Sequence, residues 1–206
     1  MMNILCDDGT QVLIEMPSVD NIGVLLSGGM DSALLLYLLL LEKITINSKT
    51  EITIFNVPNV KDDAAIHSLR IIRFLENYFS IKLNFKYTGD TTLPHYMIIN
   101  QPAADIINTN MVDILYSGVN QNPPNFFMQG PYRRRPDMPT PPRYSYPFLK
   151  LYKTHILEIY KKYNILDLAY TTHSCTESPT DACRMCFQCV ERKWAFNQLN
   201  IIDKAT

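Results

Sequence analysis

The sequence predicts an α/β fold: a doubly wound, Rossmann-like parallel sheet with a small cysteine-rich segment near its C-terminal end. Two observations predict it. Short apolar, β-branched runs alternate with segments of helical period between residues 22 and 118, and four of the five cysteines lie within 15 residues, from Cys175 to Cys189. Strand–helix alternation at this spacing implies a parallel sheet that is covered by helices on both faces.

Each expected strand is a short apolar run bounded by a turn signal. The strands expected on this basis span residues 22–26, 51–57, 82–87 and 112–118, and residues 10–15 are expected to add an edge strand. The expected helices have apolar residues at a period close to 3.6. They span residues 31–43, 62–79, 103–108, 153–163 and 191–199.

Length and composition indicate one globular domain, residues 1–206. The chain has a mass of 23.7 kDa, with 47% hydrophobic and 19% charged residues, which excludes a wholly disordered chain. Nineteen basic residues against 20 acidic ones give a net charge of −1. Proteins that hold long nucleic acids usually carry a basic excess, so we expect no stable nucleic-acid binding.

The apolar runs of the sequence are short, and this bears on membrane contact and on the compartment. The most apolar run, residues 33–41, is about half of the roughly 18 residues that a membrane-spanning helix needs, so no membrane contact is expected. The first eight residues lack the basic and apolar regions of a secretory signal. We therefore expect a cytoplasmic protein, in which cysteines stay reduced.

A proline-rich segment, residues 119–147, shows no helical or strand period. Eight of the 13 prolines lie between Pro123 and Pro147. Irregular loops of this length are functional lids or disordered segments. The basic residues Arg133–Arg135 and Arg143 are either solvated or part of a lid that closes over an anionic ligand.

The most informative segment is the turn after the first expected strand. Ser27, Gly28 and Gly29 end that strand and lead into a helix that begins with Asp31 and Ser32. Backbone N–H groups at a helix N-terminus are unpaired, and glycines let the backbone curl around an anion. The segment is therefore predicted to cradle phosphate groups.

Asp31 would repel a phosphate unless a cation lay between them, so the segment also predicts Mg²⁺. The motif is not a Walker P-loop, because no Gly-Lys-Ser/Thr sequence follows the glycines. The simpler alternative is a strand–helix turn in which Asp31 or Ser32 only caps the helix.

The pattern Ser-Gly-Gly-x-Asp-Ser resembles the signature of the PP-loop ATP pyrophosphatases. The resemblance implies an adenine nucleotide α-hydrolase-like fold that binds ATP through Ser27, Gly28, Gly29, Asp31 and Ser32 and transfers AMP to a substrate oxygen. It also implies that Phe55, Asn56 and Gly118, at the ends of two other strands, lie at the nucleotide. The superfamily includes synthetases and tRNA-thiolating enzymes.

The cysteine cluster has the spacing C-x7-C-x2-C-x2-C. It comprises Cys175, Cys183, Cys186 and Cys189, while Cys6 stands apart. Four thiolates close a tetrahedral shell around Zn²⁺ and leave no position for a catalytic water, so residues 172–199 are expected to form a structural zinc site. The alternative is an iron–sulfur cluster, whose cysteine spacing can look similar. His173 is expected to lie outside the ligand set.

Both ends of the chain together resemble the 7-cyano-7-deazaguanine synthases. The resemblance rests on the glycine turn, on Ser174-Cys175 with the spaced cysteines, and on Arg192-Lys193 with the Ala195-Phe196 that follows. It implies an ATP-dependent ligase that converts 7-carboxy-7-deazaguanine and ammonia into the nitrile. Asp31 would hold Mg²⁺, and Lys153 would stabilise charge at the phosphates. The alternative for Lys153 is a surface position at a helix start.

The segment after the fourth strand departs from that family. Residues 118–124 replace the Asp and the Tyr-Pro-Asp-like stretch that help to form the family's substrate pocket, which is typical of a diverged or phage-type member. Two other functions remain open: a tRNA-thiolating PP-loop enzyme with an iron–sulfur cluster, and a nucleotide-binding interaction module without catalysis. The family resemblance also suggests a homodimer.

Overall fold

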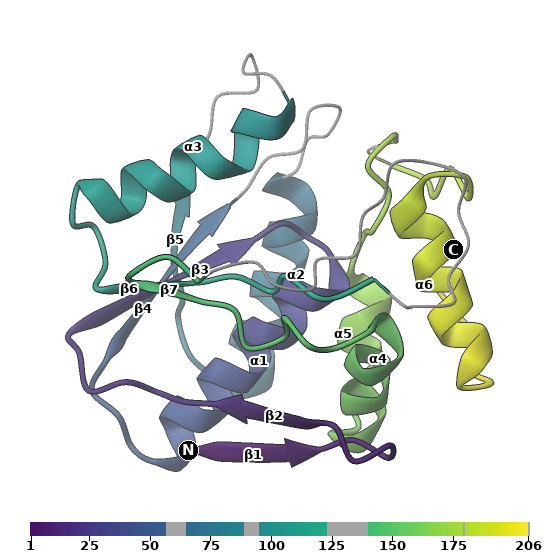
Figure 1. Cartoon of the computed structure of the whole chain (residues 1–206), viewed down its shortest axis with the longest axis horizontal. Helices are drawn as coiled ribbons and strands as arrows, with labels where there is room; N and C mark the ends of the chain where they lie inside the picture. Colours follow the sequence, from purple (N-terminus) through teal and green to yellow (C-terminus); the bar gives the residue numbers. More distant parts are fainter. Residues whose placement is uncertain (57–64, 89–94, 123–139, 179, 206) are drawn as a thin grey trace.

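The computed structural model describes residues 1–56, 65–88, 95–122, 140–178 and 180–205 (Figure 1). Seven strands are described: β1 (Met2–Leu5), β2 (Gln11–Ile14), β3 (Asn21–Leu26), β4 (Glu51–Asn56), β5 (Asn84–Tyr87), β6 (Ile114–Tyr116) and β7 (Tyr144–Ser145). The described helices are α1 (Met30–Thr45), α2 (Ala65–Phe79), α3 (His95–Asn108), α4 (Lys153–Lys162), α5 (Leu166–Thr171) and α6 (Phe187–Gln198).

The main sheet has five strands in the order β5-β4-β3-β6-β7, and every neighbouring pair is parallel. The central pair is in register from Asn21 opposite Glu51 to Leu26 opposite Asn56. From β3 the chain moves outward to β4 and β5, and then returns to β6 on the other side of β3. The strand order therefore reverses between β3 and β6, and such a switch point is where open α/β sheets bind ligands.

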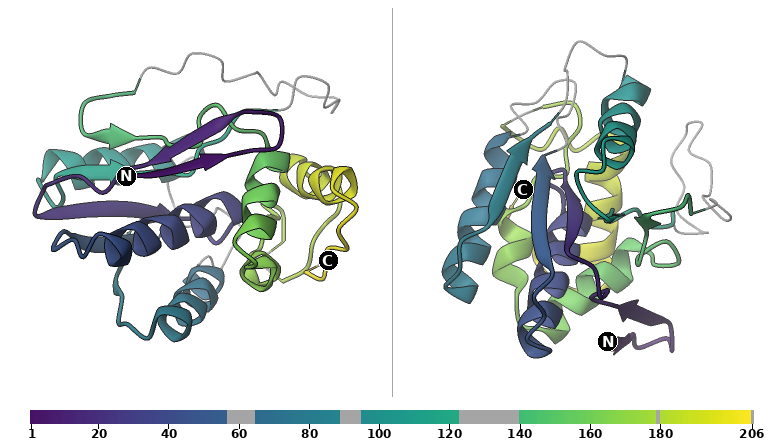
Figure 2. Two further views of the ribbon diagram at one scale, coloured as in Figure 1. Left: turned by 90° about the horizontal axis from the view of Figure 1, so that it is seen from below. Right: turned by 90° about the vertical axis from the view of Figure 1, so that its left-hand side faces the viewer.

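Helices cover both faces of this sheet, which confirms the predicted fold class. In β3 the side chains of Ile22, Val24 and Leu26 face a large core that includes α1 and α2. Leu25, from the alternate set, faces a second core with Phe55 and residues of α3. Side chains of a strand alternate between the faces of a sheet, so α3 must lie opposite α1 and α2, as Figure 2 shows.

Helix α1 is central to the large core. All eight residues from Ala33 to Leu40 are at most 2% exposed, because the helix lies between the sheet and helices α4 and α5. A helix that is apolar on all sides is stable only where it is buried on all sides. The apolar run that the sequence shows here is thus a core helix. Among the described residues, none of the helices combines the length and the apolar character needed to cross a membrane.

Strand β2 is not an edge strand of the main sheet, contrary to the expectation for residues 10–15. It pairs with β1 in a separate antiparallel hairpin, with Met2 opposite Ile14. Val12 and Ile14 of this hairpin are buried in the same core as α1. The hairpin is also fixed to α4, since the side-chain amine of Lys162 donates to the Leu5 carbonyl at 2.7 Å.

Three further elements differ from the expectation. Helix α3 starts at His95 and runs through Pro102. Within the expected loop, residues 119–147, a short strand β7 pairs with β6, while residues 123–139, including Arg133–Arg135, lie outside the described part of the chain. Helix α6 starts at Phe187, so its first turn contains Cys189.

Candidate nucleotide and metal site

The glycine turn lies at the switch point of the sheet. Ser27, Gly28 and Gly29 connect the carboxyl end of β3 to the N-terminus of α1, and Gly118 follows β6 at the same edge. A Cβ atom on Gly118 would lie 2.8 Å from the Ser32 nitrogen, so only glycine allows this close approach of the two segments. The residues predicted to bind nucleotide from the first strand and from Gly118 are thus brought together.

The two serines of the turn hold its shape. The Ser32 hydroxyl accepts a hydrogen bond from the Ser27 amide at 3.2 Å and lies 3.1 Å from the Ser27 hydroxyl. The N-cap of α1 is Gly29, and no side chain caps it. Neither Asp31 nor Ser32 therefore acts as the helix cap that the simpler interpretation requires. The first-turn N–H groups have no partner within the helix, which is the geometry of an anion site.

Gly28 is required by both its backbone angle and its surroundings. Its φ angle is +82°, which L-residues rarely adopt, and a Cβ here would lie 2.7 Å from the Cβ of His67. The imidazole ring of His67 is stacked on that of His173, with ring centroids 4.2 Å apart. The His173 amide in turn donates to the Gly28 carbonyl at 2.9 Å. Neither histidine was assigned to the turn from sequence.

Asp31 and Lys153 form a direct ion pair. The Lys153 ammonium lies 2.7 and 2.5 Å from the two oxygens of Asp31 and 3.4 Å from a carboxylate oxygen of Glu191. Lys153 is 6% exposed, so it is not the surface lysine of the alternative interpretation. Burial lowers the pKa of Lys153, but the carboxylates of Asp31 and Glu191 outweigh burial and raise it above its usual value. The side chain is therefore a fixed cation beside the turn.

Asn56 and Phe55, which the resemblance places at the nucleotide, differ in their positions in the structure. Asn56 is fully buried, and its amide nitrogen donates to the Ser68 hydroxyl at 2.9 Å and to the Leu26 carbonyl at 3.4 Å. Asn56 thus braces the strand end that leads into the turn. Phe55 is also fully buried and packs in the second core, under α3. Its side chain supports the sheet, so only its backbone can face a nucleotide.

Arg143 binds backbone carbonyls near the start of β6. Its guanidinium donates to the carbonyls of Asp113 and Ile107 at 3.0 and 2.9 Å, and also to the Val112 carbonyl. These carbonyls flank the start of β6, whereas the glycine turn and Gly118 lie at the opposite edge of the sheet, where β3 and β6 end. Of the two alternatives for Arg143, neither describes its position: the guanidinium is bonded to these carbonyls instead of being solvated or closing over a ligand, and it fixes β7 beside β6.

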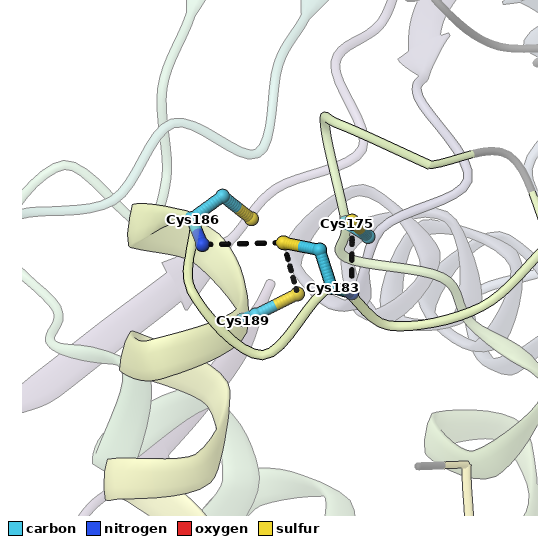
Figure 3. Close-up of side chains that lie close together, drawn as sticks. All are labelled: Cys175, Cys183, Cys186 and Cys189. Atoms are coloured by element: carbon cyan, nitrogen blue, oxygen red, sulfur yellow. Dashed lines mark hydrogen bonds between the residues drawn. The ribbon is translucent and has the colours of Figure 1, made fainter.

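The four predicted cysteine ligands converge on one point, as Figure 3 shows. The sulfur atoms of Cys175, Cys183, Cys186 and Cys189 all lie within 4.8 Å of one another. Cys186 is the N-cap of α6 and Cys189 lies in its first turn, so the helix start itself presents two ligands. Arg184, with φ of +62°, forms the tight turn between Cys183 and Cys186.

The chemistry of the donor set fits a metal ion. The Cys183 sulfur accepts hydrogen bonds from the amides of Cys186 and Met185, which lower the pKa of Cys183 to about 6. Burial instead raises the pKa of Cys189. Metals bind the thiolate, and these two amide hydrogen bonds favour the thiolate form of Cys183. A zinc tetrahedron with bonds of about 2.3 Å has sulfur–sulfur edges of about 3.8 Å. The Cys183 and Cys189 sulfurs are 4.0 Å apart, and no two of the four sulfurs are more than 4.8 Å apart.

Helix α6 connects the cysteine cluster to the region of the glycine turn through two buried residues, Glu191 and Arg192, which the sequence analysis does not assign to the site. Glu191 contacts Lys153, as described above. The guanidinium of Arg192 donates to the Thr172 hydroxyl at 2.8 Å and to the Asp203 carboxylate at 2.6 Å. Both residues are 3% exposed, and a buried charge next to a predicted phosphate site is the signal that marks them as candidates.

The chain thus combines an all-parallel main sheet with a serine–glycine turn at its switch point, the place where open α/β sheets bind ligands. Among solved structures, the chain is similar to the U34-tRNA thiolase NcsA from Methanococcus maripaludis, solved with its [4Fe-4S] cluster. The TM-score is 0.52 and the sequence identity 13%, over 95% of this chain and 68% of that chain. At this identity the similarity shows the fold. No family model and no curated protein matches the sequence.

Proposed function

We propose that the chain is an ATP pyrophosphatase that transfers AMP to an oxygen atom of its acceptor and releases pyrophosphate. The observation that carries the proposal is the ion pair of the partly exposed Asp31 with the buried Lys153 at the first turn of α1, beside the Ser27–Ser32 hydroxyl pair. A carboxylate and a fixed cation next to unpaired helix N–H groups are suited to a polyphosphate that has bound Mg²⁺.

Each residue has a role in this reaction. The first-turn N–H groups and the hydroxyls of Ser27 and Ser32 hold the β- and γ-phosphates. Asp31 holds Mg²⁺, which neutralises phosphate charge when it is bound. Lys153 stabilises the negative charge that develops when the bond between the α-phosphorus and the bridging oxygen breaks. Glu191, 3.4 Å from the Lys153 ammonium, holds that cation in place.

The first candidate acceptor is 7-carboxy-7-deazaguanine. Its carboxylate oxygen attacks the α-phosphorus, pyrophosphate leaves, and ammonia displaces AMP to give the amide. The amide oxygen then attacks the α-phosphorus of a second ATP and releases pyrophosphate. Loss of AMP, with the protons of the amide nitrogen passing to solvent, gives the nitrile. The support is the sequence pattern at Ser174-Cys175 and around the spaced cysteines, together with sulfur separations that suit one tetrahedral ion.

The second candidate acceptor is a tRNA base, whose carbonyl oxygen would be adenylated and then replaced by sulfur. The similarity to a tRNA thiolase with an iron–sulfur cluster favours it, and the comparisons support it more directly than the first candidate. In that case the four cysteines would hold a cluster whose thiolates bind different iron atoms. Such ligands lie farther apart than the ligands of a single ion, whereas here all four sulfurs lie within 4.8 Å.

One set of incubations tests the proposal. The protein is supplied with ATP and Mg²⁺ and either with 7-carboxy-7-deazaguanine and ammonium or with tRNA and sulfide. Mass spectrometry then looks for the amide, the nitrile and thiolated nucleosides. Lys153→Gln should abolish AMP release, and Lys82→Gln is the matched control because Lys82 is fully solvated. Bound zinc in colourless protein supports the first candidate, and iron with sulfide supports the second.

Absence of AMP and pyrophosphate with both acceptors would overturn the proposed reaction. It would leave the third possibility, a nucleotide-binding interaction module. Such a module should still bind nucleotide without turning it over, and calorimetry with a non-hydrolysable ATP analogue measures that binding.

A further inference from the structure

The segment that leads into the cysteine site also touches the glycine turn. His173 lies two residues before Cys175, and its amide donates to the Gly28 carbonyl at 2.9 Å. Its ring stacks at 4.2 Å on His67, the residue that closes the space above Gly28. The backbone of the turn is therefore held from outside by a segment whose far end is a metal ligand.

Arg192 fixes this segment on both sides of His173. Its guanidinium donates to the Thr172 hydroxyl at 2.8 Å, to the Ser174 hydroxyl at 3.3 Å and to the Ala169 carbonyl at 3.0 Å. The ion pair with Asp203 holds the guanidinium plane, with contacts of 2.6 and 3.0 Å. A planar group with several donors can fix a segment in this way, whereas a lysine ammonium cannot make the same set of bonds.

The position of Arg192 depends in turn on the start of α6. Cys186 is the N-cap of this helix and Cys189 lies in its first turn, so both precede Arg192 by less than two helical turns. The same helix turn carries Glu191, 3.4 Å from the Lys153 ammonium. A metal that joins these two thiolates to Cys175 and Cys183 therefore fixes both ends of the contact between α6 and residues 172–175.

We infer that metal binding at the four thiolates shapes the phosphate-binding turn, with Arg192 and His173 as positioning residues that transmit the effect. The inference rests on the nucleotide binding proposed above, but not on either acceptor. A metal that closes the chain between Cys175 and Cys189 removes conformational freedom from residues 172–175. The order gained there reaches the turn by two contacts: the hydrogen bond from the His173 amide to the Gly28 carbonyl, and the stack of the His173 ring on His67, which packs against Gly28.

Binding linkage makes the inference quantitative. If the metal raises the affinity for pyrophosphate by some factor, pyrophosphate raises the affinity for the metal by the same factor. Coupling between two sites of one protein usually gives a factor of about 5 to 150. We expect removal of the metal by a chelator to weaken pyrophosphate binding by at least about fivefold, within that range.

Hydrogen exchange gives a readout that needs no nucleotide. Peptides that cover residues 26–33 and 171–175 are followed in the protein with its purified metal content and after chelation. Both peptides should exchange faster after chelation. If only the second peptide responds, while residues 26–33 exchange at the same rate with and without metal, the inference is wrong. This result is independent of whether the protein turns over any acceptor.

Arg192→Lys tests the transmitting residue in the metal-bound protein, so a fold lost on chelation does not stop the test. The variant keeps a cation beside Asp203 and all four cysteines. We expect unchanged metal content, faster exchange of residues 26–33, and pyrophosphate binding weakened at least about fivefold. Cys6→Ala is the control, since Cys6 lies outside the metal site. Wild-type exchange and affinity in Arg192→Lys would overturn the inference.

Discussion

Substitution of Gly28 by alanine tests the geometry of the phosphate turn. Two costs arise from the structure. The φ angle of +82° disfavours any residue with a Cβ, by roughly 1–2 kcal/mol. The new Cβ would also lie 2.7 Å from the Cβ of His67, and overpacking of this kind costs typically about 1–3 kcal/mol. Together they predict a loss of about 2–5 kcal/mol of unfolding free energy.

Gly9→Ala is the matched control for this substitution. Gly9 has a similar φ of +87°, but nothing lies within 4 Å of the position that its Cβ would take. Only the backbone cost of roughly 1–2 kcal/mol applies there. Urea unfolding of both variants therefore isolates the contact with His67, and calorimetry with pyrophosphate should show weaker binding in Gly28→Ala alone. Equal unfolding free energies for the two variants would refute the close packing of Gly28 against α2.

Three further substitutions or treatments test other parts of the site. Lys153→Met leaves the Asp31 and Glu191 carboxylates without their shared cation, and urea unfolding should show a loss of about 3–5 kcal/mol, as for other broken buried pairs. In metal-free protein, the rate of alkylation of Cys183 should rise with pH and level off above its lowered pKa of about 6. The alkylation rate of an ordinary thiol keeps rising toward a pH of about 8.5. Mass spectrometry of the labelled peptide measures the rate. Phe55→Leu should cost less than about 1.5 kcal/mol and leave the affinity for ATP unchanged, because the side chain lies in the core; a weakened affinity would place it at the nucleotide after all.

Local patterns predicted the parts of the molecule that depend on neighbouring residues. The run from Ile22 to Leu26 followed by two glycines is sufficient to indicate a buried strand, a turn and a helix start. The cysteine spacing likewise indicated a common ligand set, since Cys183, Cys186 and Cys189 are close along the chain. In both cases the chemistry lies within one turn, where sequence and space coincide.

Contacts between distant residues were not predictable in this way. Asp31 and Lys153 are 122 positions apart, and Glu191 reaches them only because α4 packs against α6. The sequence predicts the strand at residues 10–15 but not its pairing with β1, because period-2 alternation indicates a strand without indicating its partner. Helix α3 extends to His95, before Pro102, although proline lowers the tendency of the preceding turn to be helical.

The unequal size of the two cores has a consequence for how the molecule opens. Of the residues whose side chains are described, seven are buried in the core under α3, whereas the core on the opposite face joins α1, α2, α4, α5 and α6 with the hairpin. Less buried apolar surface means a smaller free energy for partial unfolding, so the amides of the C-terminal half of α3 should exchange before those of α1. Thermal inactivation should therefore begin with exposure of Leu25 and Leu115, at the two strands between which the sheet reverses its order.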